Sequence, residues 1–311
     1  MPDPAAVAQA AAILCDGGLV AFPTETVYGL GADALDPKAV ARIFAVKQRP
    51  ADNPLIVHLA DAGRLDALAV TTPCARRLAA RWWPGPLTVV LRARPHVPSV
   101  TTAGLDSVAV RVPAHPVAHA LLRAANLPVA APSANRSGRP SPTTAQHVLA
   151  DLGDAVDLIL DGGRCLHGVE STVVDARGDR PIVLREGALS REQLDAVPGR
   201  AGGSASPGTR HRHYAPACRV LPVPIGEACE RAETLRRSGA QVGLVAAVGG
   251  GTPPGVLDLG RFADAAGLAA LLYDAFRRGE AAGCEVIVVE SVAEEGIGRA
   301  VMDRLRRAAI R

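Results

Sequence analysis

Short apolar runs and helical patterns alternate along the first two-thirds of the chain. Leu19–Phe22 reads as a buried strand, and Pro23 ends it because proline has no N–H to give to a strand ladder. Residues 24–31 are rich in hydroxyls and glycines and are predicted to form a turn. Asp36-Pro37 then begins an amphipathic helix, with the aspartate as its cap and the proline at the first helical position. This helix is expected to end at Lys47-Gln48-Arg49-Pro50.

Further strands and helices follow in mixed order. Strands are expected at Leu55–Leu59, Leu87–Leu91, Ser107–Val112, Pro128–Ala131, Leu158–Leu160, Ser171–Val174 and Ile182–Leu184. Helices are expected at Ala60–Leu68, Thr72–Trp82 and His115–Ala125, with a turn at Pro84-Gly85-Pro86. This alternation predicts an α/β fold in which helices flank a mixed, twisted sheet.

The composition changes at about residue 199. The next twenty residues are rich in glycine, serine, proline and histidine and almost lack large apolar side chains, which is typical of a linker or mobile loop. Beyond them, strands are expected at Arg219–Pro222, Val242–Ala247 and Glu285–Glu290, and helices at Glu227–Arg237, Phe262–Arg278 and Gly298–Ala309. We therefore predict a first domain over residues 1–200, a linker over 201–218 and a small Rossmann-like, three-layer α/β domain over 219–311.

Length and composition narrow the class of protein. A chain of 311 residues is long enough for two domains. A net charge of +3 and an aromatic content of 3% argue against nucleic-acid binding, which needs a concentrated basic surface and stacking side chains. Six scattered cysteines without a C-x-x-C pair favour reduced thiols. With neither a signal peptide nor an apolar run of membrane-spanning length in view, we expect a cytoplasmic protein.

Four cations lie at the ends of predicted elements. Lys47 and Arg49 follow the first helix, and Arg111 and Arg185 end two strands. Helix C-termini attract cations in any case, and a single strand-end arginine is often a solvated edge residue. Together, however, the four side chains could line one cavity whose charge would suit a triphosphate.

Uncharged polar groups form a second set of candidates. Ser133 and Asn135 follow a short buried strand, where they could hold a ligand or merely close a turn. Thr143 precedes a helix and could cap it or contact phosphate there. Glu170 could bind a metal or an ammonium group, or pair with a structural arginine. His58, on a strand, is more often a core histidine than a ligand.

Specific motifs run in a fixed order through most of the chain. They are FPTETVYGLG, KQRP and NPLIVH within residues 22–58, WPGPLT (83–88), TAGLDSVAVRVP (102–113), APSAN (131–135), SPTTA (141–145) and GVESTVVD (168–175). This series resembles the YrdC-like domain of L-threonylcarbamoyladenylate synthases. SPGTRHRHYAP (206–216) resembles the linker of the two-domain members of that family.

The resemblance implies a nucleotidyltransferase reaction. L-Threonine and bicarbonate or carbon dioxide would give N-carboxy-threonine, whose carboxylate attacks the α-phosphate of ATP and expels pyrophosphate. Such a transfer depends on positioning and charge stabilisation more than on covalent help from the protein. Mg²⁺ would arrive on the ATP phosphates and need no dedicated protein ligands. The product would supply partner proteins that make threonylcarbamoyladenosine (t6A) in tRNA, and direct tRNA binding by this chain is expected to be weak or absent.

The resemblance also implies residue roles. ATP would contact Lys47, Arg49, Thr102, Asn135, Thr143, Arg185 and Tyr214, and Lys47 and Arg49 would be catalytic. L-Threonine would contact Thr24, His58, Ser133 and Ser171, with Arg111 on its carboxylate. The linker would act as a lid, with His213 and Tyr214 near the nucleotide. It departs from the usual family pattern at Thr209, Arg210 and His211, where only Arg210 keeps the usual charge.

Three other functions remain open on the sequence. The fold could serve as an RNA-binding module, although the charge and the scarcity of aromatics speak against it. It could belong to the carbamoyltransferases that carry this domain, but those also have zinc fingers, whose C-x-x-C pairs are missing here. A regulatory protein could keep the pocket without catalysis, against which the set Lys47, Arg49, Ser133 and Asn135 argues.

Overall fold

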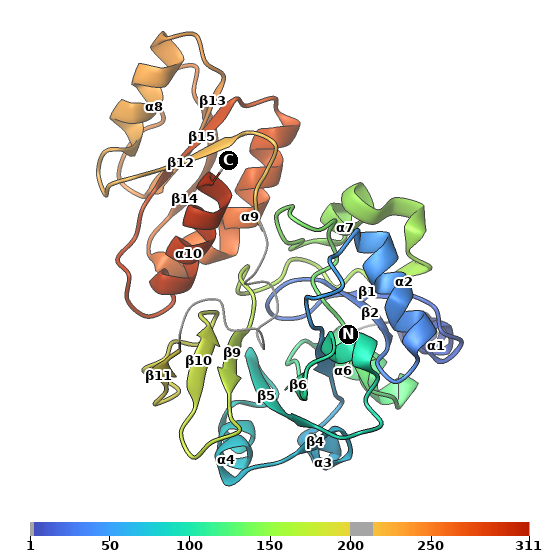
Figure 1. Cartoon of the computed structure of the whole chain (residues 1–311). Coiled ribbons are helices and arrows are strands. Elements are labelled where there is room, and N and C mark those ends of the chain that lie inside the picture. The colour runs from blue at the N-terminus through green and yellow to red at the C-terminus, as the bar shows by residue number, and fades with distance from the viewer. Residues whose placement is uncertain (1–2, 200–213, 311) are drawn as a thin grey trace.

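Two β-sheets organise the chain (Figure 1). The computed structural model describes residues 3–199 and 214–310. An eleven-stranded mixed sheet lies within residues 20–198, and a four-stranded sheet lies within residues 219–290. The predicted linker residues 201–213, including Thr209, Arg210, His211 and His213, lie outside the described residues.

The large sheet is mixed and consists mostly of short strands. Its strands are β1 (Val20–Phe22), β2 (Gly29–Asp33), β3 (Ile56–His58), β4 (Ala69–Val70), β5 (Leu87–Ala93), β6 (Ser107–Arg111), β7 (Val129–Ala130), β8 (Leu158–Ile159), β9 (Thr172–Asp175), β10 (Ile182–Arg185) and β11 (Val197–Pro198). They lie in the order β11-β10-β9-β5-β6-β3-β7-β2-β1-β8, with β4 on β5. Because β3 and β6 run parallel and pair His58 with Arg111, these two strand ends meet at the same edge of the sheet.

Helices cover both faces of the large sheet. They are α1 (Pro4–Cys15), α2 (Pro37–Lys47), α3 (Leu65–Leu68), α4 (Pro73–Trp82), α5 (Ser99–Thr102), α6 (Pro116–Ala125) and α7 (Ala145–Leu152), with 3₁₀ turns at Ala62–Arg64 and Gly153–Ala155. Leu14 of α1 and Leu121 of α6 pack with Phe22 on one face. Ile43 of α2 and Leu78 of α4 belong to the core on the opposite face. The predicted mixed sheet with flanking helices is therefore confirmed.

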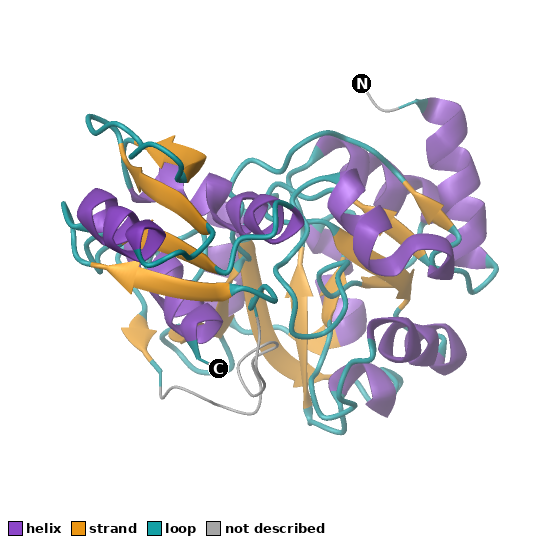
Figure 2. Ribbon diagram, turned by 90° about the horizontal axis from the view of Figure 1, so that it is seen from above, coloured by secondary structure: helices purple, strands orange, loops and turns teal. Residues whose placement is uncertain are grey.

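The second sheet is fully parallel and lies between two helical layers. Its strands are β12 (Arg219–Val223), β13 (Val242–Ala247), β14 (Leu257–Phe262) and β15 (Val286–Glu290), in the order β12-β15-β13-β14. α8 (Ala228–Arg237) packs on one face, and α9 (Ala265–Ala281) and α10 (Gly298–Ala309) pack on the other. Figures 1 and 2 show α9 and α10 on the side that faces the large domain. The three-layer arrangement matches the prediction.

The predicted turn over residues 24–31 is wrong at its end. Gly29 to Gly31 belong to β2, which pairs antiparallel with β1. A Cβ atom on Gly31 would lie 2.8 Å from carbon atoms of both Phe22 and Val129. Glycine is therefore required here by close packing within the sheet and does not mark a turn.

Two predicted helices are also wrong in extent. The helix expected over Phe262–Arg278 begins only at Ala265, because Phe262 ends the unpredicted strand β14 and Asp264 caps the helix. The helix expected over Ala60–Leu68 is reduced to a 3₁₀ turn and a single α-helical turn before β4. None of the described helices has the length and apolar character needed to cross a membrane.

Candidate functional site

A small buried cavity of about 60 Å³ lies where several strand ends of the large sheet meet. The loop after β1 forms one wall, and the ends of β3, β6 and β10 and the residues after β7 form the others. Its polar lining residues are Thr24, Thr26, Tyr28, Arg49, His58, Arg111, Ser133, Glu170, Ser171, Arg185 and Tyr214.

Two of the cavity residues are neighbours across the parallel strands. His58 and Arg111 are paired in register at the ends of β3 and β6, and both are buried. His58 Nδ1 lies 3.2 Å from the carbonyl oxygen of Ile56. Burial and the adjacent Arg111 guanidinium lower the pKa of His58 to about 3, so that its ring is neutral at physiological pH.

Arg111 is held by a buried ion pair that the sequence did not reveal. Its Nη2 lies 2.7 Å from Oε1 of Glu25, and its Nη1 donates to Oγ1 of Thr26 at 2.9 Å. Its Nε donates to the carbonyl of Gly85. Burial pushes the pKa of Glu25 upward, but Arg111 outweighs this effect and holds the pKa below its ordinary value. The arginine is thus fixed in place with its charge already shared with a carboxylate.

Arg49 and Arg185 bring two more guanidinium groups to the cavity. Arg49 donates to the carbonyl oxygens of Asn53 and Pro54, at 3.2 and 2.9 Å. Arg185, at the end of β10, donates to the carbonyl and the hydroxyl of Ser171, at 2.8 and 3.3 Å. Burial lowers the pKa of Arg49 to about 10, and burial likewise lowers the pKa of Arg185. Both groups still carry their charge at neutral pH, in a place where an anion would be attracted strongly.

Lys47 lies behind the cavity wall and supports it. Its Nζ donates to the carbonyl oxygens of Ser133 and Asn135, and the side chain is buried. Burial, with a smaller contribution from Arg49, lowers the pKa of this amine well below its ordinary value. Ser133 Oγ donates to Oδ1 of Asn135 at 2.5 Å, and Asn135 Nδ2 donates to the carbonyls of Arg136 and Arg139. The lysine therefore fixes the backbone from which Ser133 projects.

The hydroxyl groups of Thr24 and Ser171 are also held in place by hydrogen bonds. Thr24 Oγ1 lies 2.8 Å from Thr26 Oγ1 and donates to the carbonyl of Val27 at 2.6 Å. Ser171 Oγ lies 2.8 Å from Thr88 Oγ1. These contacts leave short, uncharged polar groups at fixed positions beside the guanidinium groups.

The structure brings together most, but not all, of the residues singled out in the sequence. Nine of them line the cavity: Thr24, Arg49, His58, Arg111, Ser133, Glu170, Ser171, Arg185 and Tyr214. Lys47 and Asn135 stand one layer behind Ser133. Thr143 is buried and contacts His147, and Thr102 donates its hydroxyl to the carbonyl of Ser99; neither lines the cavity.

Glu170 links the cavity to the small domain. It accepts hydrogen bonds from Ser141, from Tyr273 of α9 and from Nε and Nη2 of Arg304 in α10, the last two at 3.1 Å. Burial raises its pKa, but Arg304 and then Arg185 outweigh this effect and hold the pKa below its ordinary value. Of the three roles open for this residue, the described structure shows the pairing with a structural arginine.

Tyr214 closes the same corner from the end of the linker. Its ring stacks on Tyr273 with centroids 5.6 Å apart, and the central guanidinium carbon of Arg304 lies over the Tyr214 ring, 5.3 Å from its centroid. The sequence did not single out Tyr273 or Arg304, because both stand in ordinary amphipathic helices. Among the described residues, no group of three or more His, Cys, Asp or Glu side chains could hold a metal ion.

Two protein families account for nearly the whole chain. The model of the family described as "Telomere recombination" (Sua5, YciO and YrdC) matches residues 12–187. The model described as "Threonylcarbamoyl-AMP synthase, C-terminal domain" matches residues 189–310. The chain belongs to the threonylcarbamoyl-AMP synthase family.

Individual members of the threonylcarbamoyl-AMP synthase family align along more than nine-tenths of their length. The protein of that name from Pyrococcus abyssi is 45% identical over 96% of this chain and 93% of its own, and that from Bacillus subtilis is 44% identical over 97% and 92%. The solved structure of P. abyssi Sua5 complexed with L-threonine matches with a TM-score of 0.92 at 43% identity, covering 99% of this chain and 95% of that one. The two-domain type predicted from the linker motif is confirmed.

Proposed function

We propose that this protein is a nucleotidyltransferase that makes threonylcarbamoyl-AMP and pyrophosphate from L-threonine, bicarbonate and ATP. The observation that carries the proposal is the convergence of Arg49, Arg111 and Arg185 with uncharged hydroxyls in one buried cavity. Three guanidinium groups suit ligands with several negative charges, and the hydroxyls suit a small polar amino acid. The family relationship identifies which anionic and amino-acid ligands these would be.

The threonine half of the site would consist of neutral groups around one cation. Thr24, His58, Ser133 and Ser171 would surround the substrate, and Arg111 would hold its carboxylate while sharing its charge with Glu25. A neutral His58 adds a hydrogen-bonding group without repelling a substrate ammonium group. Held beside the amine, bicarbonate or carbon dioxide would form the carbamate with no covalent help from the protein.

The ATP half would depend on charge. Arg49 and Arg185 would attract the phosphates, with Tyr214 beside them in the cavity. Lys47 and Asn135 would act from behind Ser133, and Thr102 and Thr143 would belong to a part of the nucleotide site that lies outside the cavity. In the transfer step the carbamate oxygen forms a bond to the α-phosphorus, and the bond from that phosphorus to the bridging oxygen of pyrophosphate breaks. Fixed guanidinium groups stabilise the charge that develops on the leaving pyrophosphate.

Mg²⁺ is proposed to enter with ATP and to neutralise phosphate charge. Glu170, which lines the cavity, is already engaged by Arg304, and Glu25, which lies beside the cavity, is engaged by Arg111. The ion would therefore keep waters and phosphate oxygens as its ligands, as Mg²⁺ commonly does.

The remaining assignments concern the whole protein. We propose residues 1–200 as the catalytic domain, 201–218 as a lid and 219–311 as its support. The product is proposed to pass to proteins that complete t6A in tRNA, with little direct binding of tRNA by this chain. All six cysteines are free thiols, in keeping with the cytoplasmic location that we propose.

Mass spectrometry of the reaction mixture tests this function. Purified protein with ATP, Mg²⁺, bicarbonate and L-threonine should accumulate threonylcarbamoyl-AMP, and ¹³C-bicarbonate should place its label in that product. Omission of L-threonine or bicarbonate should abolish it. An active preparation that yields a carbamoyl adenylate from carbamoyl phosphate instead would contradict the proposal.

A further inference from the structure

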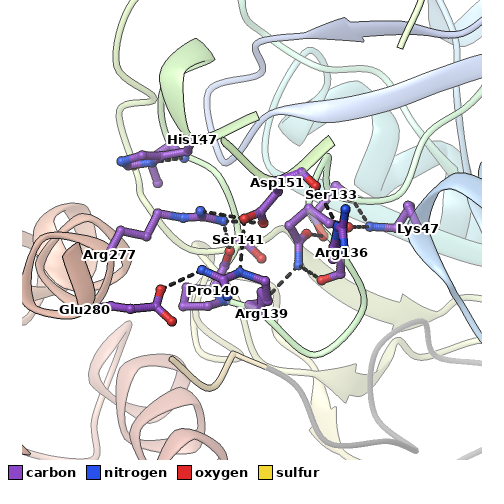
Figure 3. Close-up of polar contacts among 12 residues, drawn as sticks. Lys47, Ser133, Arg136, Arg139, Pro140, Ser141, His147, Asp151, Arg277 and Glu280 are labelled. Carbon is purple, nitrogen blue, oxygen red and sulfur yellow. Dashed lines mark hydrogen bonds and ion pairs between the residues drawn. The ribbon is translucent and has the colours of Figure 1, made fainter. Parts of the chain in front are cut away.

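A polar network connects helix α9 of the small domain with the segment that carries Ser133 and Asn135 (Figure 3). Arg277 of α9 donates to both carboxylate oxygens of Asp151, at 3.1 and 2.8 Å, and to the carbonyl of Pro140. Arg277 and Asp151 are both buried, so this is an ion pair inside the domain interface.

A second α9 side chain reaches the same loop. The carboxylate of Glu280 accepts from Nη2 of Arg139 through one oxygen and from the N–H of Ala217 through the other. Arg139 also donates through Nε to Asp151 at 3.0 Å. Two side chains of α9 therefore bind the loop of residues 136–141: Arg277 at Pro140 and Glu280 at Arg139.

Hydrogen bonds connect this loop, through Asn135, to a residue that lines the cavity. The carbonyls of Arg136 and Arg139 accept both N–H groups of the Asn135 amide, each at 2.9 Å. The oxygen of that amide accepts the hydroxyl of Ser133, which lines the cavity. The orientation of the Ser133 hydroxyl thus depends on loop carbonyls whose position is set by α9.

We propose that Arg277 and Glu280 are positioning residues for the site in the large domain. They lie in the other domain, and their polar contacts among the described residues are with Asp151, Pro140, Arg139 and Ala217, which do not line the cavity. Through these contacts they fix the loop that orients Asn135 and Ser133. The inference rests on the proposed function for its kinetic consequences. The small domain would then contribute directly to the geometry of the substrate site.

Arg278 provides a matched control. It is the next residue on α9, but within residues 3–199 and 214–310 its hydrogen bonds go to the carbonyls of Leu259 and Asp258 in the small domain. Arg277→Met alone would leave Asp151 short of a partner, which could unfold the interface. The test variant is therefore Arg277→Met with Asp151→Asn, which removes both charges together, and Glu280→Gln is a second variant that removes only one.

Kinetics separate positioning from simple stabilisation. We expect KM for L-threonine or ATP to rise about tenfold in the Arg277→Met/Asp151→Asn protein, because a displaced supporting group disturbs the groups that touch substrate. Glu280→Gln should raise KM in the same direction, and Arg278→Met should stay within about twofold of the unaltered protein. A loss of kcat in proportion to the unfolded fraction, with KM unchanged in all three, would overturn the inference.

Hydrogen exchange gives a readout that does not depend on the reaction. Amides of residues 133–141 should exchange faster in the Arg277→Met/Asp151→Asn and Glu280→Gln proteins than in Arg278→Met. If the unaltered protein releases no pyrophosphate, the proposed function fails while this measurement still decides the positioning role. Equal protection of residues 133–141 in all variants would overturn it.

Discussion

At the residue scale, the cavity is built from charged side chains that the protein already holds in place. Arg111 is paired with Glu25, Arg185 contacts Ser171, and Lys47 donates to two backbone carbonyls. Because these side chains are already held in place, substrate binding requires less reorganisation of the cavity. It also means that removing one of these side chains changes the wall of the cavity and not only its charge.

Replacing Lys47 tests this view directly. Lys47→Met should lower kcat/KM for pyrophosphate release by about 10²–10³, since it frees the carbonyls of Ser133 and Asn135 in a desolvated site. Far-UV circular dichroism should show an intact fold. Lys38→Met, on the exposed side of the same helix, is the control. Normal turnover in a folded Lys47→Met protein would remove Lys47 from the site.

The low pKa of His58 in the folded protein predicts that the free energy of unfolding depends on pH. Its pKa is about 3 in the folded protein, against 6.5 when unperturbed, because of burial and then Arg111. Between these values the unfolded chain binds a proton that the folded protein does not, so stability is lost as the pH falls from 6.5 towards 3. Urea unfolding should show that His58→Gln reduces this slope by up to about 1.4 kcal/mol per pH unit.

The control for this titration is His96→Gln, because His96 is exposed. An identical slope in the His58→Gln and unaltered proteins would show that His58 is not held neutral by its surroundings.

At the scale of elements, one loop is packed against α9 with no space to spare. Gly168 has φ +68°, and a Cβ added there would lie 2.3 Å from the carbonyl oxygen of Ala269. Gly168→Ala should therefore lower the free energy of unfolding by about 1–3 kcal/mol, from backbone strain and displacement of the helix. Gly178→Ala, at an open position without positive φ, should be near neutral in the same denaturant titration. Equal effects of the two substitutions would contradict this packing.

The elements that the sequence predicted well are those with local signals. Asp36 does cap α2, accepting the N–H of Lys38 at 2.8 Å, and the strand ends at His58 and Arg111 lie where the apolar runs indicated. The strand at Gly29–Asp33 was missed because its glycines are required by close contacts with residues far along the chain. The local pattern of apolar and polar residues does not reveal such contacts.

The candidate site was predictable in part for the same reason. The sequence placed Arg49, Arg111 and Arg185 at element ends, but their convergence depends on the order of strands in the sheet. That Lys47 faces a backbone segment and not the cavity depends on the path of residues 133–135. The partners Glu25 and Arg304 could not be matched from the sequence, because each pair joins distant segments.

At the scale of the whole molecule, one buried ion pair joins the domains at the cavity. Arg304→Met would remove the guanidinium that pairs with the buried Glu170 carboxylate, so it should cost about 3–5 kcal/mol in the free energy of unfolding. Glu170→Gln combined with Arg304→Met should restore much of that loss, because no unpaired charge remains. Additive losses in the double variant, measured by thermal unfolding, would show that the two side chains do not interact.

The whole protein is proposed to join L-threonine, bicarbonate and ATP at this cavity. The most direct measurement is the rate of pyrophosphate release from purified protein with ATP and Mg²⁺, in the presence and absence of L-threonine and bicarbonate. L-Serine and carbamoyl phosphate serve as alternative substrates. Pyrophosphate should be released only when L-threonine and bicarbonate are present together. Release driven by carbamoyl phosphate, or none with both substrates present, would contradict it.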